Sequence, residues 1–198
     1  MVYRIPAVNL VGRGCLAQLK DEIGTLGCKK ALVVSDKFLT ENGVVEKVTK
    51  VLDQVGIEHT LYNDVKQNPS VANVEGGLEV LKKENCDFIV SIGGGSPQDC
   101  GKAISVLATN GGKITDYEGV NKSQKKCLPI VAIATTAGTS AEVTINYVIT
   151  DEETHIKMIM VDRNTLASIT VNDPELMLSK PAGLTAATGM DALIHAME

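Results

Sequence analysis

Short runs of apolar residues alternate along the chain with stretches of helical spacing. The runs at 31–35 (ALVVS), 88–92 (FIVSI) and 128–134 (LPIVAIA) are almost wholly apolar, which is typical of parallel strands buried on both faces. Between them, Ser70 can cap a helix that ends near residue 84, and 98–109 also has helical spacing. This alternation predicts an α/β fold with a doubly wound, mostly parallel sheet of the Rossmann type.

The pattern changes after residue 142. The segments 143–150 and 156–161 flank the polar loop DEETH, which predicts an antiparallel hairpin, and a further strand is expected at 168–171. From Pro181 onward the apolar residues recur with helical spacing. We therefore expect an α/β domain over residues 1–180, followed by the first helix of a separate helical domain over 181–198.

Composition and charge exclude several classes of function. The chain has 198 residues and a net charge of −5, with 19 basic residues, 24 acidic residues, no Trp and 2 Phe. This balance gives no cationic footprint for nucleic acid, and with only 4 Tyr beside the 2 Phe there are few rings on which bases could stack. No apolar run approaches the ~20 residues of a bilayer helix, and Pro6 and Asn9 interrupt any signal-peptide core. Five cysteines without a C-x-x-C pair favour reduced thiols. We expect a cytoplasmic protein that binds neither nucleic acid nor membrane.

Two polar turns follow two of the predicted strands directly. In I-G-G-G-S-P-Q-D (92–99), the glycines let the backbone approach a phosphate, whose charge the start of the next helix would favour. T-T-A-G-T-S (135–140) carries hydroxyls that could bind phosphate or ribose oxygens. Taken singly, each turn could be purely structural. Because ligands bind at the carboxyl ends of parallel strands, the two turns together predict a dinucleotide cleft.

Three further side chains have two interpretations each. Asp36 ends the first apolar strand, where an acid can accept ribose hydroxyls and repel a 2′-phosphate, favouring NAD over NADP. Without the neighbouring turns, a helix cap or a solvated loop acid would be the better interpretation. Asp191 and His195 are four residues apart and share one helix face, where they could hold a divalent metal. An isolated pair of this kind is more often a surface pair, and it leaves a metal site incomplete.

Three long motifs together resemble one enzyme family. GGGSPQDCGKAI, TTAGTSAEVT and VNDPELMLSKPAGLTAATGMDALIHAME resemble the iron-dependent (group III) alcohol dehydrogenases, and among them the propanediol dehydrogenases and lactaldehyde reductases. The resemblance spans essentially the whole chain but only about the first half of such an enzyme. Members of this family have an N-terminal NAD-binding α/β domain and a C-terminal helical domain, with the active site in the cleft between them.

The resemblance implies a role for particular residues. At the adenosine end of NAD, Asp36 would bind the ribose and Asn68 would line the adenine side. The pyrophosphate would be bound by Gly94, Gly95 and Ser96, with Asp99 nearby. The phosphates and the nicotinamide half would contact Thr135, Thr136, Thr139 and Ser140, and the nicotinamide ribose would contact Val148 and Lys157. Asp191 and His195 match the first two of the family's metal ligands, and the other two are histidines further along. The implied reaction is reversible hydride transfer between a primary alcohol or diol and NAD. No side chain here is implied as a catalytic base, since Fe²⁺ would act as the Lewis acid.

Several alternatives stay open at this point. Zinc-dependent glycerol dehydrogenases and dehydroquinate synthases share the architecture, and Zn²⁺ or another divalent metal could replace Fe²⁺. The chain could also act as a non-catalytic nucleotide-binding fragment. We expect the 198 residues alone to bind NAD weakly if at all and not to turn over an alcohol or aldehyde substrate. A homo-oligomer is expected, with the edge strand at 8–11 and the apolar face after Pro181 as candidate contacts.

Overall fold

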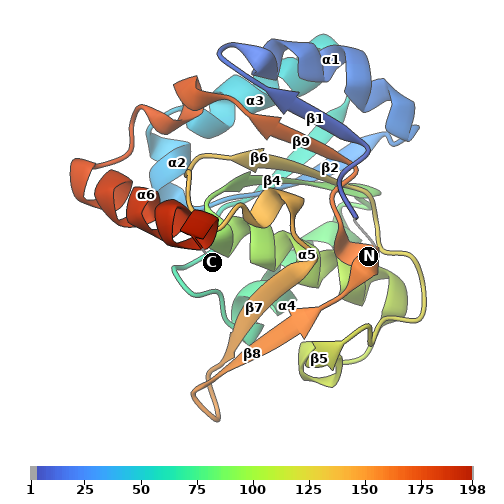
Figure 1. The fold of residues 1–198 in the computed structure, drawn as a ribbon. Coiled ribbons are helices and arrows are strands. Elements are labelled where there is room, and N and C mark those ends of the chain that lie inside the picture. Colours follow the sequence, from blue (N-terminus) through green and yellow to red (C-terminus); the bar gives the residue numbers. More distant parts are fainter. Residues whose placement is uncertain (1–3, 198) are drawn as a thin grey trace.

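A six-stranded parallel sheet forms the centre of the molecule (Figure 1). The computed structural model describes residues 4–197. The strands lie in the order β1–β9–β6–β4–β2–β3, and every neighbouring pair is parallel. They are β1 (Val8–Val11), β9 (Ile169–Asn172), β6 (Ile130–Ala134), β4 (Phe88–Gly93), β2 (Lys30–Val34) and β3 (Glu58–Tyr62). The predicted doubly wound, mostly parallel sheet is confirmed.

Helices cover both faces of this sheet (Figure 1). One face is covered by α1 (Leu19–Glu22), α2 (Lys37–Glu41) and α3 (Val44–Gln54), and the other by α4 (Val71–Lys83) and α5 (Gly95–Asn110). Strand residues alternate between the two cores: Val33 packs with α1 and α3, whereas its neighbour Leu32 packs with α4 and α5. Because both faces are buried, the central strands are apolar at nearly every position.

The predicted hairpin forms a small second sheet beside the main one. Strands β7 (Asn146–Asp151) and β8 (Ile156–Val161) are antiparallel, and the two-residue strand β5 (Gly119–Val120) pairs with β8. The first hairpin strand begins later than predicted, because the chain first forms a 3-10 helix at Ala141–Val143. Strand β5 is too short to leave a periodic signal. Other 3-10 helices lie at Cys15–Gln18, Ile23–Leu26, Ile114–Tyr117, Arg163–Thr165 and Pro174–Met177.

The remaining helix boundaries follow local chemistry. Ser70 caps α4 as predicted and accepts a hydrogen bond from the backbone N–H of Asn73. Helix α5 begins at Gly95, earlier than the predicted Gln98, because Pro97 is tolerated in a first turn, where its missing N–H costs nothing. Strand β6 begins after Pro129, which has no N–H to donate to the ladder.

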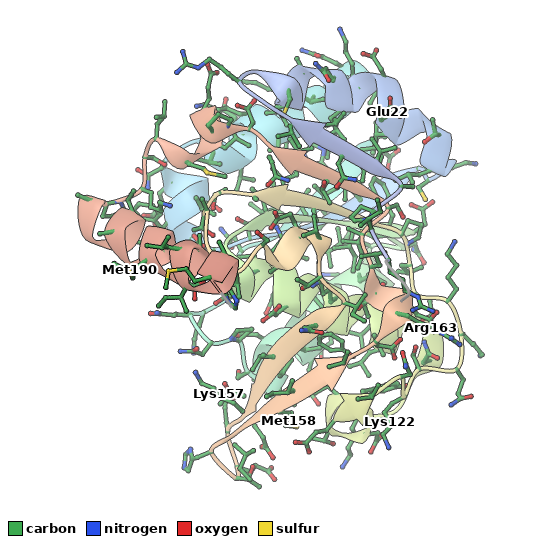
Figure 2. All side chains as sticks on the ribbon, in the orientation of Figure 1. Glu22, Lys122, Lys157, Met158, Arg163 and Met190 are labelled. Atoms are coloured by element: carbon green, nitrogen blue, oxygen red, sulfur yellow. The ribbon has the colours of Figure 1, made fainter. Side chains whose placement is uncertain are left out.

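The last helix, α6 (Ala182–Met197), has no buried residue. The exposed fractions of Met190 and Met197 are 58% and 75%, and Met190 is labelled on this helix in Figure 2. In the described part of the chain, no helix combines the length and apolar character needed to cross a bilayer. All five cysteines are free thiols, four of them buried.

Candidate functional site

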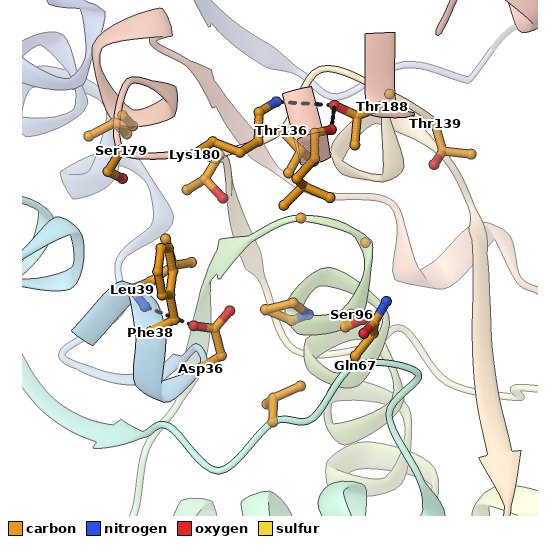
Figure 3. A pocket seen from close by; sticks show the side chains of 18 of the residues that line it. Asp36, Phe38, Leu39, Gln67, Ser96, Thr136, Thr139, Ser179, Lys180 and Thr188 are labelled. Atoms are coloured by element: carbon orange, nitrogen blue, oxygen red, sulfur yellow. Dashed lines mark hydrogen bonds between the residues drawn. The ribbon is translucent and has the colours of Figure 1, made fainter. Parts of the chain in front are cut away.

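A cavity of about 490 Å³ opens at the carboxyl ends of strands β2 and β4 (Figure 3). The chain leaves these two neighbouring strands in opposite directions, β2 toward β3 and β4 toward β6. The cavity therefore lies at the switch point of the sheet, where open α/β folds bind ligands. Its volume is within the range of small-molecule sites.

Three separate segments carry predicted cofactor-binding residues to this cavity. The lining includes Asp36 after β2, Gly94, Gly95 and Ser96 after β4, and Thr135, Thr136 and Thr139 after β6. Ser140 lies in a small adjoining hollow, which Gly94 and Thr139 also line. The fold thus brings together most of the residues that the sequence motifs predicted.

Close contacts explain two of the glycines in the turn between β4 and α5. Gly93 has a φ of +153°, and a Cβ there would lie 2.4 Å from the Pro97 ring. A Cβ on Gly94 would lie 3.1 Å from the Thr136 side chain. At Gly95, by contrast, a Cβ would have no atom within 4 Å, so the backbone at this position faces open space.

The start of helix α5 leaves backbone donors for a ligand. Gly94 is the N-cap residue and has no side chain with which to cap the helix. The first N–H groups of a helix have no partner within it, and Pro97 has no N–H at all. Gly95 and Ser96 therefore supply backbone N–H donors at the positive end of the helix dipole. This arrangement suits a phosphate.

A buried glutamine fixes this turn to the sheet. Gln98 is 2% exposed, and its Nε2 donates to the carbonyl oxygen of Ile133 at 3.0 Å. It also donates to the Ser91 carbonyl at 3.3 Å. The side chain of Ser35 at the end of β2 donates to the Ile92 carbonyl at 2.9 Å. The ends of β2, β4 and β6 are thereby held in fixed relation around the cavity.

Asp36 acts as a helix cap and also faces the cavity. Its Oδ1 accepts a hydrogen bond from the backbone N–H of Leu39 at 2.8 Å, which caps α2. Figure 3 shows the other carboxylate oxygen turned toward the cavity. The capping interpretation is therefore correct, and the same side chain still offers an acceptor to a ribose hydroxyl.

Other predicted residues lie outside the cavity lining. Asn68 donates its N–H to the Ser96 hydroxyl at 3.2 Å and accepts from the Nζ of Lys157 at 3.0 Å; Lys157 lies on the hairpin (Figure 2). Asp99 is turned inward, and its Oδ2 accepts from the N–H of Val148 at 3.1 Å. Burial raises the pKa of Asp99 to about 6, against the opposing effect of Lys102. These contacts join the hairpin to the segments that form the cavity.

The sequence motifs missed part of the lining. Phe38, Val65, Lys66, Gln67, Leu176, Ser179, Lys180, Leu184 and Thr188 also line the cavity. The Nζ of Lys180 donates to the Thr188 hydroxyl at 3.1 Å (Figure 3). The residues near 66 follow β3 and those near 176 follow β9. The carboxyl-end rule applied to all strands, instead of only those with polar turns, would have identified both segments.

The proposed metal ligands form a pair on α6, as the spacing predicts. The Asp191 Oδ1 and His195 Nε2 atoms are 3.7 Å apart, and both side chains are about half exposed. A Cβ on Gly138 would lie 3.2 Å from the Asp191 carboxylate, so the pair adjoins the 135–140 turn. Carboxylate and imidazole suit a divalent metal. Residues 4–197 contain no cluster of three or more metal-ligating side chains, and a metal site usually needs at least three protein ligands.

Comparison with known proteins gives one consistent result. The model of the family "Iron-containing alcohol dehydrogenase" matches residues 6–174. Alcohol dehydrogenase 4 of Schizosaccharomyces pombe is 53% identical over 196 residues, which are 99% of this chain and 46% of that protein. The crystal structure of a 1,3-propanediol oxidoreductase is 46% identical with a TM-score of 0.96, and the match covers 100% of this chain and 52% of that one.

One solved relative contains a nucleotide. The sulfoacetaldehyde reductase of Bifidobacterium kashiwanohense, in complex with NAD⁺, is 34% identical with a TM-score of 0.90, over 100% of this chain and 52% of that one. The chain spans about half the length of the relatives it matches. The resemblance inferred from the three motifs is confirmed. This chain belongs to the family of iron-containing alcohol dehydrogenases.

Proposed function

We propose that the cavity binds NAD, as the cofactor half of an enzyme that transfers a hydride reversibly between a primary alcohol or diol and the nicotinamide ring. The observation that carries this proposal is the convergence on one cavity of two turns able to bind phosphate and one carboxylate able to bind ribose. The match to an alcohol dehydrogenase family, and the NAD⁺ bound by one relative, support it.

The residues that line the cavity favour one direction for the bound dinucleotide. Asp36 and the apolar side chains of Phe38 and Val65 suit the adenosine end, and the free amides of Gly95 and Ser96 suit the pyrophosphate. The nicotinamide would then lie toward the 135–140 turn. That turn adjoins the Asp191 carboxylate, so the ring and the metal ligands would be at the same end of the cavity.

The metal has a defined role in this proposal. Fe²⁺ held in part by Asp191 and His195 would polarise the oxygen of the alcohol or aldehyde. Two ligands do not complete a site, so we expect the 198-residue chain not to oxidise alcohols, although it can still bind NAD weakly. Clear alcohol oxidation by the purified chain alone would contradict this. Metal analysis of a protein with the full ligand set would separate iron from the zinc alternative.

Calorimetric titration with NAD⁺ and NADP⁺ tests the proposal, with Asp36→Asn as the matched variant. Asn is as good a helix cap as Asp, so thermal stability should change little. We expect the native chain to bind NAD⁺ more tightly than NADP⁺, and the variant to lose most of this preference because the charge that repels the 2′-phosphate is gone. Absence of NAD⁺ binding by the native chain would contradict the proposed function, and equal affinity for both nucleotides would contradict the role of Asp36.

A further inference from the structure

A lysine that the proposed chemistry does not use is buried behind the cavity wall. Lys102 lies on α5 and is 1% exposed. Its Nζ donates to the carbonyl oxygens of Ala141 and Asn146, both at 2.7 Å, and to the Thr144 hydroxyl at 3.2 Å. An ammonium group has three protons to donate, so every donor is used. A buried charge is tolerated only with such partners.

The three acceptors belong to one irregular segment. Ala141 lies in the 3-10 helix that follows the 135–140 turn, and Asn146 begins β7. Ser140, at the junction, has a φ of +55°, a left-handed conformation that costs a non-glycine residue energy. A backbone of this shape persists only when its surroundings hold it in place. Lys102 supplies the hydrogen bonds that a neighbouring strand would otherwise provide.

The position of Lys102 connects the two halves of the cofactor cavity. Helix α5 carries Gly95 and Ser96 at its start and Lys102 two turns further along. One rigid helix thus presents the phosphate-binding amides and also anchors the segment that continues from Thr139 and Ser140. Asp99, one turn before Lys102, makes a parallel link to the Val148 N–H.

Two carboxylates near Lys102 oppose the effect of burial on the pKa of its amine. Burial lowers the pKa of Lys102 to about 8, while Asp99 and Glu142 oppose the shift. At neutral pH the amine therefore keeps its proton and all three hydrogen bonds. We propose that Lys102 is a positioning residue, which fixes the 135–140 turn relative to the start of α5 and thereby sets the affinity of the cavity for NAD. The part about affinity rests on the proposed function.

The test compares Lys102→Met with a control on the same helix. Met keeps the unbranched stem and removes the donors. Ser105→Ala removes another buried donor of α5, whose hydroxyl binds the Leu128 carbonyl at 2.9 Å near the start of β6, at the opposite end of that strand from the cavity. Amide hydrogen exchange of residues 136–146 and the Kd for NAD⁺ are measured for both variants, together with the unfolding midpoint.

We expect Lys102→Met to raise exchange in 136–146 about tenfold or more and to weaken NAD⁺ binding by a similar factor. Ser105→Ala should lower the unfolding midpoint without either local effect. If Lys102→Met fails to fold, Thr144→Val removes one acceptor and should raise exchange in the same segment about two- to fivefold. Exchange in 136–146 that matches the control in these variants would overturn the proposal.

Failure of the proposed function is distinguishable from failure of this inference. If the native chain binds no NAD⁺, the proposed function and the affinity part fall together, while the exchange data still decide whether Lys102 positions the turn. If the native chain binds NAD⁺ and Lys102→Met binds it equally well, the affinity part alone is wrong.

Discussion

The carboxyl group of Asp99 lies at the junction of α5 with the hairpin, and burial raises its pKa to about 6. A raised pKa means that the folded state binds a proton that the unfolded state has already released between about pH 4 and pH 6. The free energy of unfolding therefore falls through this window as pH rises, and the loss persists at neutral pH. The residue that the sequence assigned to the neighbourhood of the phosphate is thus a source of pH-dependent stability.

Replacing Asp99 by Asn tests this effect. The amide oxygen can still accept from the Val148 N–H, but it carries no charge to desolvate. We expect the variant to gain stability over the native chain as pH rises from about 4 to about 6, reaching a difference of about 3 kcal/mol. Urea unfolding at a series of pH values measures this, and two curves that stay parallel across the window would refute the assignment.

Among the elements, the turn between β4 and α5 leaves different room for a side chain at each of its glycines. Gly93→Ala would place a methyl group against Pro97 in a conformation that L-residues rarely adopt. We expect it to lower the free energy of unfolding by about 2 kcal/mol or more. Gly95→Ala meets no atom within 4 Å, so it should leave stability unchanged. Because Gly95 lines the cavity, the added methyl group should weaken NAD⁺ binding.

Chemical denaturation and calorimetry separate these two glycine variants. If Gly93→Ala and Gly95→Ala lost equal stability, the contact with Pro97 would not explain the need for glycine at position 93. If Gly95→Ala bound NAD⁺ like the native chain, the phosphate would not pass over this backbone.

The elements differ in how far the sequence could predict them. The apolar strands β2, β4 and β6 were predictable because burial on both faces leaves a continuous hydrophobic run, and Ser70 marked the start of α4. Strand β5 was not predictable, since it exists only through its pairing with β8. The inward turn of Asp99 depends on where β7 passes, which is a tertiary property and leaves no local pattern.

At the scale of the whole molecule, α6 presents an apolar face with little to cover it. Met190, Leu193 and Met197 share one side of this helix and are each more than half exposed, and burial of such side chains stabilises association. We expect the chain to self-associate, and the double substitution Met190→Lys with Leu193→Lys to lower its apparent mass. Val11→Lys, on the exposed edge strand β1, is the comparison. Sedimentation that responds to Val11→Lys alone would assign the contact to the sheet edge instead.

Binding of NAD in the cavity at the ends of β2, β4 and β6 is the basis of the proposed function. Titration of the isotope-labelled chain with NAD⁺, followed by NMR of its backbone amides, tests this most directly. We expect the amides of Asp36, Gly94–Ser96 and the 135–140 turn to shift, with little change along β1 or α1. Shifts that avoid these three segments, or no shifts at millimolar NAD⁺, would contradict it.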